Sequence, residues 1–171
     1  MPRLYIIPTP IGNLEDITLR ALKILREVDL IAAEDTRHTR KLLTHYDITT
    51  PLTSYYDSIE TRKSIFLLRK LQAGWTVALV SDAGTPCIAD PGYELVVAAV
   101  EEGFPVTPIP GPAMVTSLLS VGGLPTDRFV FEGFLPAKRS QRYKRFEELA
   151  HEDRTLVFYE SPRRLVGTLE D

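Results

Sequence analysis

The stretch VSDAGTPCIADPG, residues 80–92, decides the fold, because it joins a strand to a helix through a loop longer than a turn requires. Before it stands TVALV (76–80), which is apolar throughout, as is typical of a strand covered on both faces of a sheet. After it comes YELVVAAV (93–100), whose apolar residues recur with a helical period, so that a helix is expected over 91–102 with Asp90 and Pro91 at its start. The Gly, Pro, Asp, Ser and Thr residues between them indicate a shaped backbone at the strand's carboxyl end.

The same alternation of short apolar runs and helical patterns extends through residues 1–109. Helices are expected after a cap at Asn13, from a cap at Thr36, and from Ser58 to a stop at Gly74. Strands are expected at 4–7, 30–33, 51–55, 76–80 and 105–109, the last as a proline-bearing edge strand. This order predicts an α/β domain with a mostly parallel sheet flanked by helices.

A second α/β domain is expected to begin at Pro110, so that the predicted domains are 1–109 and 110–171. Its predicted elements are a helix opened by Pro112 (112–121), a strand (128–134), a charged helix (139–150) and a strand (155–160). The final run SPRRLVGTLED (161–171) is typical of a helix that has just begun, so we expect the second domain to be truncated.

Composition narrows the class of protein. The 171 residues carry a formal net charge of −3, so any contact with a nucleic acid must come from a local basic patch. A single cysteine, Cys87, excludes an internal disulfide framework and a multi-cysteine zinc site, and no metal is expected. We interpret this thiol as a small buried apolar group rather than a nucleophile. No signal peptide or membrane-spanning run is visible, and a soluble cytoplasmic protein is expected.

Three loops rich in Gly or Pro follow predicted strands, at 8–13, 81–92 and 110–114. Because ligands of open parallel sheets bind at the carboxyl ends of the strands, these loops predict a preformed concave site lined by amides and small hydroxyls. The alternative is that each is only a tight strand-to-helix turn. The dinucleotide, P-loop and zinc-protease motifs are missing from the sequence.

Three charged segments are candidates for catalytic or phosphate-binding roles. In AEDTRHTRKLL (33–43) a carboxylate beside cations follows a strand, so it could act as a base or position a hydroxyl, unless the segment is only a capped surface helix. In KRSQRYKR (138–145) the cations oppose the dipole of the predicted helix, which indicates phosphate binding or merely a solvated helix start. YESPRR (159–164) places Glu160 beside two arginines, in either an ion pair or a substrate contact.

Together these motifs resemble the small-subunit ribosomal RNA 2′-O-ribose methyltransferases of the tetrapyrrole-methylase (class III) superfamily. The segments that carry the resemblance are PTPIGNLEDITLRAL, EDTRHTRKLL, VSDAGTPCIADPG, PGPAMVTSLL, FEGFLPAK and YESPRRL. The resemblance implies two α/β domains with S-adenosylmethionine (SAM) in the cleft between them, and a homodimer. It also implies a substrate, the 2′-hydroxyl of a cytidine in the RNA of the small ribosomal subunit.

The resemblance further implies which residues contact the cofactor. The first domain would contribute Pro10, then Ser81, Asp82, Ala83 and Thr85 on the methionine side, and Ile88 and Ala89 beside the adenosine. The residues from 110 onward would contribute Gly111, Pro112, Ala113, Ser117, Phe134 and Leu135.

The expected reaction is in-line methyl transfer to a ribose hydroxyl of a cytidine splayed out of the folded RNA. The candidate catalytic residues are Asp35, Arg37 and Glu160. The predicted phosphate contacts are Arg37, Arg40, Lys41, Lys138, Arg139, Arg142, Lys144 and Arg145. Two alternatives stay open: a methylase of a tetrapyrrole ring with the same fold and cofactor, and a non-catalytic SAM-binding fragment.

Overall fold

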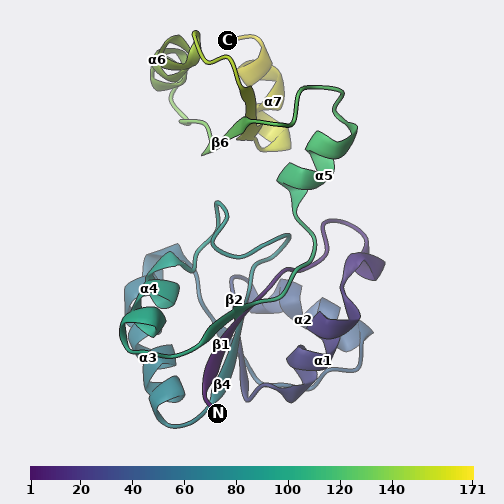
Figure 1. The fold of residues 1–171 in the computed structure, drawn as a ribbon, viewed down its shortest axis with the longest axis vertical. Coiled ribbons are helices and arrows are strands. Elements are labelled where there is room, and N and C mark those ends of the chain that lie inside the picture. Colours follow the sequence, from purple (N-terminus) through teal and green to yellow (C-terminus); the bar gives the residue numbers. More distant parts are fainter. The chain divides into compact units, whose positions relative to one another are not determined.

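The computed structural model describes residues 1–171, apart from the side chain of Ser58. The chain forms two compact units, Met1–Met114 and Val115–Asp171, so the division falls a few residues after the predicted boundary at 109/110. Figure 1 shows the elements of both units, which are described separately below.

The first unit contains a five-stranded sheet in the order β3-β2-β4-β1-β5, in which every neighbouring pair is parallel. Its strands are β1 (Arg3–Ile7), β2 (Leu30–Ala33), β3 (Leu52–Ser54), β4 (Thr76–Val80) and β5 (Val106–Pro108). All five predicted strands are therefore present, and the proline-bearing strand lies at an edge, as predicted. The α/β fold class with a parallel sheet flanked by helices is confirmed.

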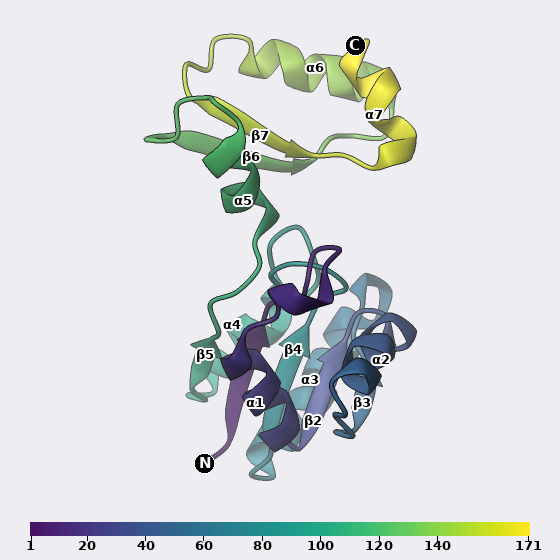
Figure 2. The ribbon, with the colours of Figure 1, turned by 90° about the vertical axis from the view of Figure 1, so that its right-hand side faces the viewer.

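Helices cover both faces of this sheet (Figure 2). One core cluster joins α1 (Leu19–Glu27) and α2 (Thr36–His45) to one face, and the other joins α3 (Glu60–Gln72) and α4 (Tyr93–Glu101) to the opposite face. Strand β4 contributes residues to both clusters, with Ala78 and Val80 in the first and Val77 and Leu79 in the second. This double burial is why its sequence is apolar without alternation.

The start of α2 differs from the prediction. The Asp35 side chain caps this helix by accepting a hydrogen bond of 2.8 Å from the backbone N–H of Arg37. The predicted cap, Thr36, is the first helical residue instead. A carboxylate is at least as good an N-cap as a hydroxyl, and it also suits the positive end of the helix dipole.

The start of α4 differs as well. The helix begins at Tyr93, and its N-cap position is held by Gly92 with φ of 143°, so the prediction that Asp90 and Pro91 open it was wrong. Both residues belong to the loop that precedes the helix. That loop therefore extends over the whole of 81–92, which places more backbone at the end of the sheet.

Two short 3₁₀ turns precede helices of the first unit. Asn13 caps η1 (Leu14–Asp16) rather than the following helix, and α1 has its own cap in Thr18, whose hydroxyl accepts from the backbone N–H of Ala21. The turn η2 (Asp57–Ile59) leads into α3. A capping role for the Ser58 side chain lies outside the described residues, whereas Gly74, with φ of 92°, ends α3 as predicted.

The second unit is built on two parallel strands, β6 (Phe129–Phe134) and β7 (Thr155–Tyr159). The helix α6 (Arg139–Leu149) connects them, and α7 (Pro162–Leu169) follows β7. The helix α5 (Met114–Val121) begins two residues after the predicted first residue, Pro112. Within the described chain, no helix has the length and apolar character needed to cross a membrane.

Candidate functional site

Two of the predicted ligand loops are joined where β1 and β4 end side by side. Thr9 and Gly84 exchange both backbone hydrogen bonds, each of 2.9 Å. The Thr9 hydroxyl donates to the Ser81 carbonyl at 2.9 Å, and the Ser81 hydroxyl donates to the Gly84 carbonyl at 3.1 Å. Because these groups are buried, the contacts fix the loops 8–13 and 81–92 against each other.

The third predicted loop lies against the first two. The Thr85 hydroxyl donates to the Pro112 carbonyl at 3.1 Å. A Cβ atom on Gly111 would lie 3.1 Å from Cβ of Pro8, so the two loops are in close contact at this position. The carboxyl ends of the strands therefore bring the three loops 8–13, 81–92 and 110–114 together. That Pro10, Ser81, Asp82, Thr85, Gly111 and Pro112 contact one ligand stays a prediction.

The backbone of loop 81–92 is held in an uncommon conformation. Cys87 and Ala89 both adopt positive φ, 69° and 62°, in the left-handed region that non-glycine residues rarely occupy. Such strain persists only where the surroundings impose it, and it concentrates at binding sites. Ala83, Ile88 and Ala89 are exposed on this loop, which leaves small and apolar surface available to a ligand.

Glu60 of α3 anchors the far end of this loop. Its Oε1 atom accepts hydrogen bonds from the Gly92 backbone N–H at 2.9 Å and from the Tyr55 hydroxyl at 3.0 Å. The buried Tyr55 hydroxyl also contacts the Ser64 hydroxyl at 2.9 Å. Neither Thr9 nor Glu60 was among the residues predicted from the sequence, because their partners are distant in the chain.

Carboxylates surround this end of the sheet, and we call Glu34, Asp57, Asp82 and Asp90 the acidic rim. Burial raises the pKa of Glu34, and the charges of Asp90 and Asp82 raise it further. Burial also raises the pKa of Asp90, although a hydrogen bond with Ser81 opposes the shift. Within the described residues no group of carboxylate, His and Cys side chains is arranged to hold a metal ion. The clustered carboxylates therefore favour a ligand that carries positive charge.

The thiol of Cys87 should be inert in this setting. Burial raises its pKa to about 11, with smaller contributions from the negative charges of Glu60 and Asp90. We expect iodoacetamide to alkylate this thiol at pH 8 roughly ten times more slowly than a free cysteine, since the lower thiolate fraction outweighs the thiolate's greater nucleophilicity. Timed alkylation followed by mass spectrometry measures the rate. A rate equal to that of the urea-unfolded chain would contradict the half-buried placement of Cys87.

The candidate catalytic pair Asp35 and Arg37 lies at the start of α2. The Asp35 carboxylate accepts from the Arg37 guanidinium at 2.8 and 3.1 Å, and this contact holds the pKa of that carboxyl well below its usual range. The Asp35 backbone N–H donates to Oδ1 of Asp82 at 3.0 Å, which ties α2 to loop 81–92. A carboxylate that binds protons this weakly is poorly suited to act as a base, so the geometry favours a positioning role.

Cations follow along the exposed face of α2. An open groove of about 390 Å³ is lined by Thr36, Arg37, Arg40, Lys41 and Thr44, and we call it the α2 groove. Arg37 is paired with Asp35, whereas in the described part of the chain no carboxylate lies within ion-pair distance of Arg40 or Lys41. These two cations are therefore available to an anionic ligand.

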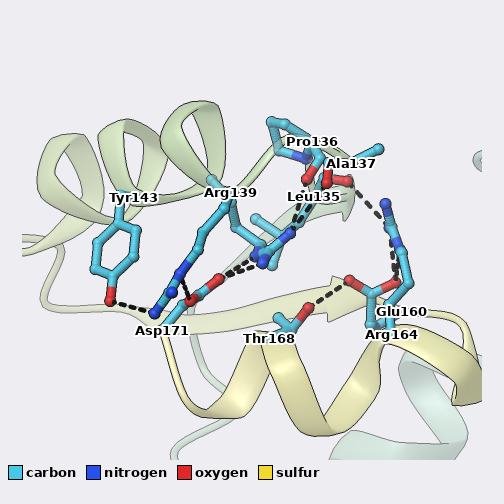
Figure 3. Close-up of polar contacts among 10 residues, drawn as sticks. Leu135, Pro136, Ala137, Arg139, Tyr143, Glu160, Arg164, Thr168 and Asp171 are labelled. Carbon is cyan, nitrogen blue, oxygen red and sulfur yellow. Dashed lines mark hydrogen bonds and ion pairs between the residues drawn. The ribbon is translucent and has the colours of Figure 1, made fainter.

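The second basic segment is largely paired within its own unit (Figure 3). Arg142 is 8% exposed, donates from Nε to Asp171 at 2.7 Å, and also contacts the carbonyls of Pro136 and Ala137. Arg139 donates to Asp171 at 2.6 Å, and Arg145 pairs with Glu132 and Glu148. The burial of Arg142 argues against its predicted phosphate contact, because its donors are already used. Lys138 and Lys144 are exposed.

Glu160, the third candidate catalytic residue, is held at the start of α7 (Figure 3). Its carboxylate accepts from the Ser161 backbone N–H at 2.7 Å, from Arg164 Nε at 2.7 Å and from the Thr168 hydroxyl at 2.8 Å. Burial acts to raise the pKa of this carboxyl, but the three hydrogen bonds outweigh it and the net shift is downward. A carboxylate with these three hydrogen bonds is better suited to stabilise the start of α7 than to accept a proton.

Three of the remaining predicted cofactor residues lie beyond the loops just described. Ser117, Phe134 and Leu135 belong to the second unit, so their role in the cofactor site stays a prediction. There Leu135 is buried, whereas Phe134 is exposed and stacks edge-on against Tyr159. Ala113 lies at the end of the first unit, next to Pro112.

The fold is a parallel α/β sheet whose carboxyl end carries three joined loops. This arrangement is that of an α/β ligand-binding protein. The family of tetrapyrrole (corrin/porphyrin) methylases matches residues 3–171, and the chain belongs to this family. The crystal structure of a diphthine synthase has a TM-score of 0.73 at 19% identity, covering 96% of this chain and 71% of its own. That of uroporphyrin-III-C-methyltransferase from Thermus thermophilus has a TM-score of 0.61 at 21% identity, covering 80% and 61%. At such identities these structures show the fold alone.

Within the family, the chain is most informatively compared with two curated relatives. It is 56% identical over 169 residues to the ribosomal RNA small subunit methyltransferase I of Escherichia coli O157:H7, which covers 99% of this chain and 59% of that protein. It is 54% identical over 170 residues to the protein of the same name from Vibrio cholerae, again covering 99% and 59%. The chain thus spans about 59% of the length of these relatives.

Proposed function

We propose that this protein is a SAM-dependent methyltransferase that modifies the RNA of the small ribosomal subunit, at the ribose 2′-hydroxyl of a cytidine. The substrate class rests on the similarity to relatives named as ribosomal RNA small subunit methyltransferases. The observation that carries the cofactor assignment is the joining of the three loops at the carboxyl ends of β1, β4 and β5. The resemblance also leads us to propose a homodimer, which light scattering would test.

The chemistry of these loops fits the cofactor. SAM carries a sulfonium and an ammonium group, which suit the acidic rim, and a carboxylate, which suits backbone amides and small hydroxyls. The exposed Ile88 and Ala89 offer apolar surface of the kind that an adenine ring packs against. The cofactor would supply an electrophilic methyl group, and the remaining tasks fall to the protein.

Those tasks are to position the ribose and to remove its proton. Asp35 is bonded to Asp82 through its backbone N–H and to Arg37 through its carboxylate. This pair lies beside the proposed cofactor loops, where it can orient a ribose. The unpaired cations of the α2 groove lie on the same helix and can hold the flanking phosphates. Alignment supplies much of the rate in such a transfer, so a strong base is not required of Asp35 or Glu160.

Cofactor binding is expected to depend on the charge of the acidic rim. The pKa of Glu34 is raised, so this carboxyl gains its proton at a higher pH than an ordinary glutamate does as the pH falls. Because the protonated rim attracts a cation less, we expect SAM affinity to fall severalfold between pH 7 and pH 5. Glu34→Gln should lower affinity at pH 7 by roughly threefold and flatten this dependence, and isothermal titration calorimetry measures both. Equal pH dependence in the variant and the parent would remove Glu34 from the site.

The function itself is tested with the full-length protein and radiolabelled SAM. Unmodified small ribosomal subunits, their naked RNA and a tetrapyrrole precursor are offered in parallel, and the RNA is digested to nucleosides. We expect label in 2′-O-methylcytidine. Label in a base or in another nucleoside would overturn the proposed position, and label only in the tetrapyrrole would overturn the proposed substrate while retaining the cofactor.

A further inference from the structure

A small hollow lies beside the joined loops, inside the first unit. It has a volume of about 30 Å³ and lies at the point where the ends of β1 and β4 meet the first turn of α2. Its lining residues are Thr9, Pro10, Leu14, His38, Thr39, Leu42, Ser81 and Asp82. Only Pro10, Ser81 and Asp82 among them were predicted to contact the cofactor, so most of the hollow is not explained by that assignment.

Thr39 is the unusual member of this lining. It is 2% exposed and shares the buried face of α2 with Leu42 and Leu43. Its hydroxyl oxygen has no hydrogen-bond partner within the described part of the chain. A helical threonine often donates to the carbonyl four residues earlier, but here the Asp35 carbonyl accepts only from the Thr39 backbone N–H, at 3.0 Å. A buried hydroxyl without a partner is costly, so one is expected from outside the chain.

The size and lining of the hollow limit what that partner can be. A volume of about 30 Å³ accommodates one water-sized group and excludes a ring or a phosphate. Thr39 can donate to or accept from such a group, and the Asp82 carboxylate can accept from it. Pro10, Leu14 and Leu42 supply the apolar part of the wall, and His38, Thr9 and Ser81 add further polar groups. The small volume, rather than the wall, limits the occupant to a single oxygen.

We propose that the hollow is a subsite for one hydroxyl-sized oxygen, and that Thr39 is its positioning residue. The oxygen belongs either to an ordered water or to a ribose hydroxyl of the RNA substrate, and the second source rests on the proposed function. In both cases the oxygen connects α2, which carries the α2 groove, to the loop that carries Asp82. The subsite thereby couples the expected RNA-binding helix to the expected cofactor loops.

The two sources are separated by crystal structures of the full-length protein, one with SAM alone and one with SAM and an oligoribonucleotide that contains the target cytidine. A water is the source where an oxygen lies within hydrogen-bond distance of Thr39 Oγ1 in the first structure. A ribose hydroxyl is the source if the hollow is empty in the structure with SAM alone and holds a ribose oxygen in the structure with RNA. It is also the source if a ribose oxygen takes the place of the water when RNA is bound. An empty hollow in both structures overturns the proposal.

Two variants make the proposal falsifiable by solution measurements. Thr39→Val keeps the shape of the side chain and removes the hydroxyl, whereas Thr39→Ser keeps the hydroxyl. We expect Thr39→Val to lower the melting temperature by a few degrees for a water, or to raise the KM for RNA about tenfold for a ribose hydroxyl. Thr39→Ser should restore most of either loss. The exposed Thr61→Val on α3 serves as the matched control and should change neither quantity.

A Thr39→Val variant that is no less stable than the parent and has an unchanged KM overturns the proposal. If the hydroxyl has no partner in the working protein, Thr39→Val removes an unsatisfied buried group, and the variant should be as stable as the parent or more stable, with unchanged KM. The water outcome does not require that the substrate is RNA. Failure of the proposed function would appear separately, as wild-type protein that transfers no label to RNA.

Discussion

Replacing Gly92 with alanine is expected to lower the free energy of unfolding by about 4 kcal/mol, from backbone strain and overpacking together. Gly92 has φ of 143°, a conformation that L side chains rarely adopt. An added Cβ would lie 2.5 Å from Sγ of Cys87 and 2.7 Å from Cδ2 of Leu79, a core residue that is 1% exposed. Neither neighbour can move freely, because Cys87 is in the strained loop and Leu79 is in β4. We therefore also expect loss of SAM binding.

The matched control is Gly74→Ala. Gly74 also has a positive φ, 92°, but an added Cβ would meet nothing within 4 Å. This variant should cost only about 1–2 kcal/mol, the strain of the left-handed backbone alone. Urea unfolding followed by the fluorescence of Trp75, which lies in the first unit, compares the two variants. Equal losses would show that the loop relaxes around the added methyl group, and that its shape is not fixed by packing.

The sheet could be predicted because its strands are short, buried and separated by helical patterns. Strand β4 is the clearest example, since Val77 to Val80 are all apolar and buried on both faces of the sheet. The errors fall at helix starts, where several residues can serve as caps. Asp35 and Thr36 are adjacent capping residues, and nothing local decides between them. Gly92 caps α4 through a backbone conformation that the sequence does not reveal.

The site could be predicted only as far as its loops. Gly and Pro after apolar runs mark the three loops, but the contacts that join them are between residues far apart in the chain, such as Thr9 with Gly84 and Glu60 with Gly92. A threonine on the apolar face of a helix is a visible signal, and Thr39 could have been noticed as the polar residue beside Leu42 and Leu43.

The roles of the basic clusters are the hardest feature to predict from the sequence. Arg142 and Arg40 look alike as members of basic helical segments. The structure pairs Arg142 with Asp171, which follows it by 29 residues, whereas Arg40 faces the α2 groove. A carboxylate at that separation gives no periodic signal, so the sequence could not distinguish a buried ion pair from an available phosphate contact. Of the predicted RNA contacts, those on α2 are therefore the better supported.

Reversing the two unpaired cations of the α2 groove is expected to weaken RNA binding by roughly 100-fold at physiological salt, because Arg40→Glu with Lys41→Glu removes two phosphate contacts and adds repulsion. The slope of log affinity against log salt should become shallower by about 2. SAM affinity should stay within about twofold, since neither side chain belongs to the loops assigned to the cofactor. Filter binding of small-subunit RNA at several salt concentrations and calorimetry with SAM measure the two effects.

The control is an equal reversal of charge on the other face of the same sheet. Arg62 and Arg69 are exposed on α3, which packs on the face opposite to α2, so Arg62→Glu with Arg69→Glu changes the net charge by the same amount. If only long-range attraction matters, both double variants should lose RNA affinity equally. If the α2 groove contacts phosphates, only the α2 variant should lose most of its RNA affinity and show the shallower salt dependence. A loss confined to the α3 variant would move the RNA interface to the opposite face.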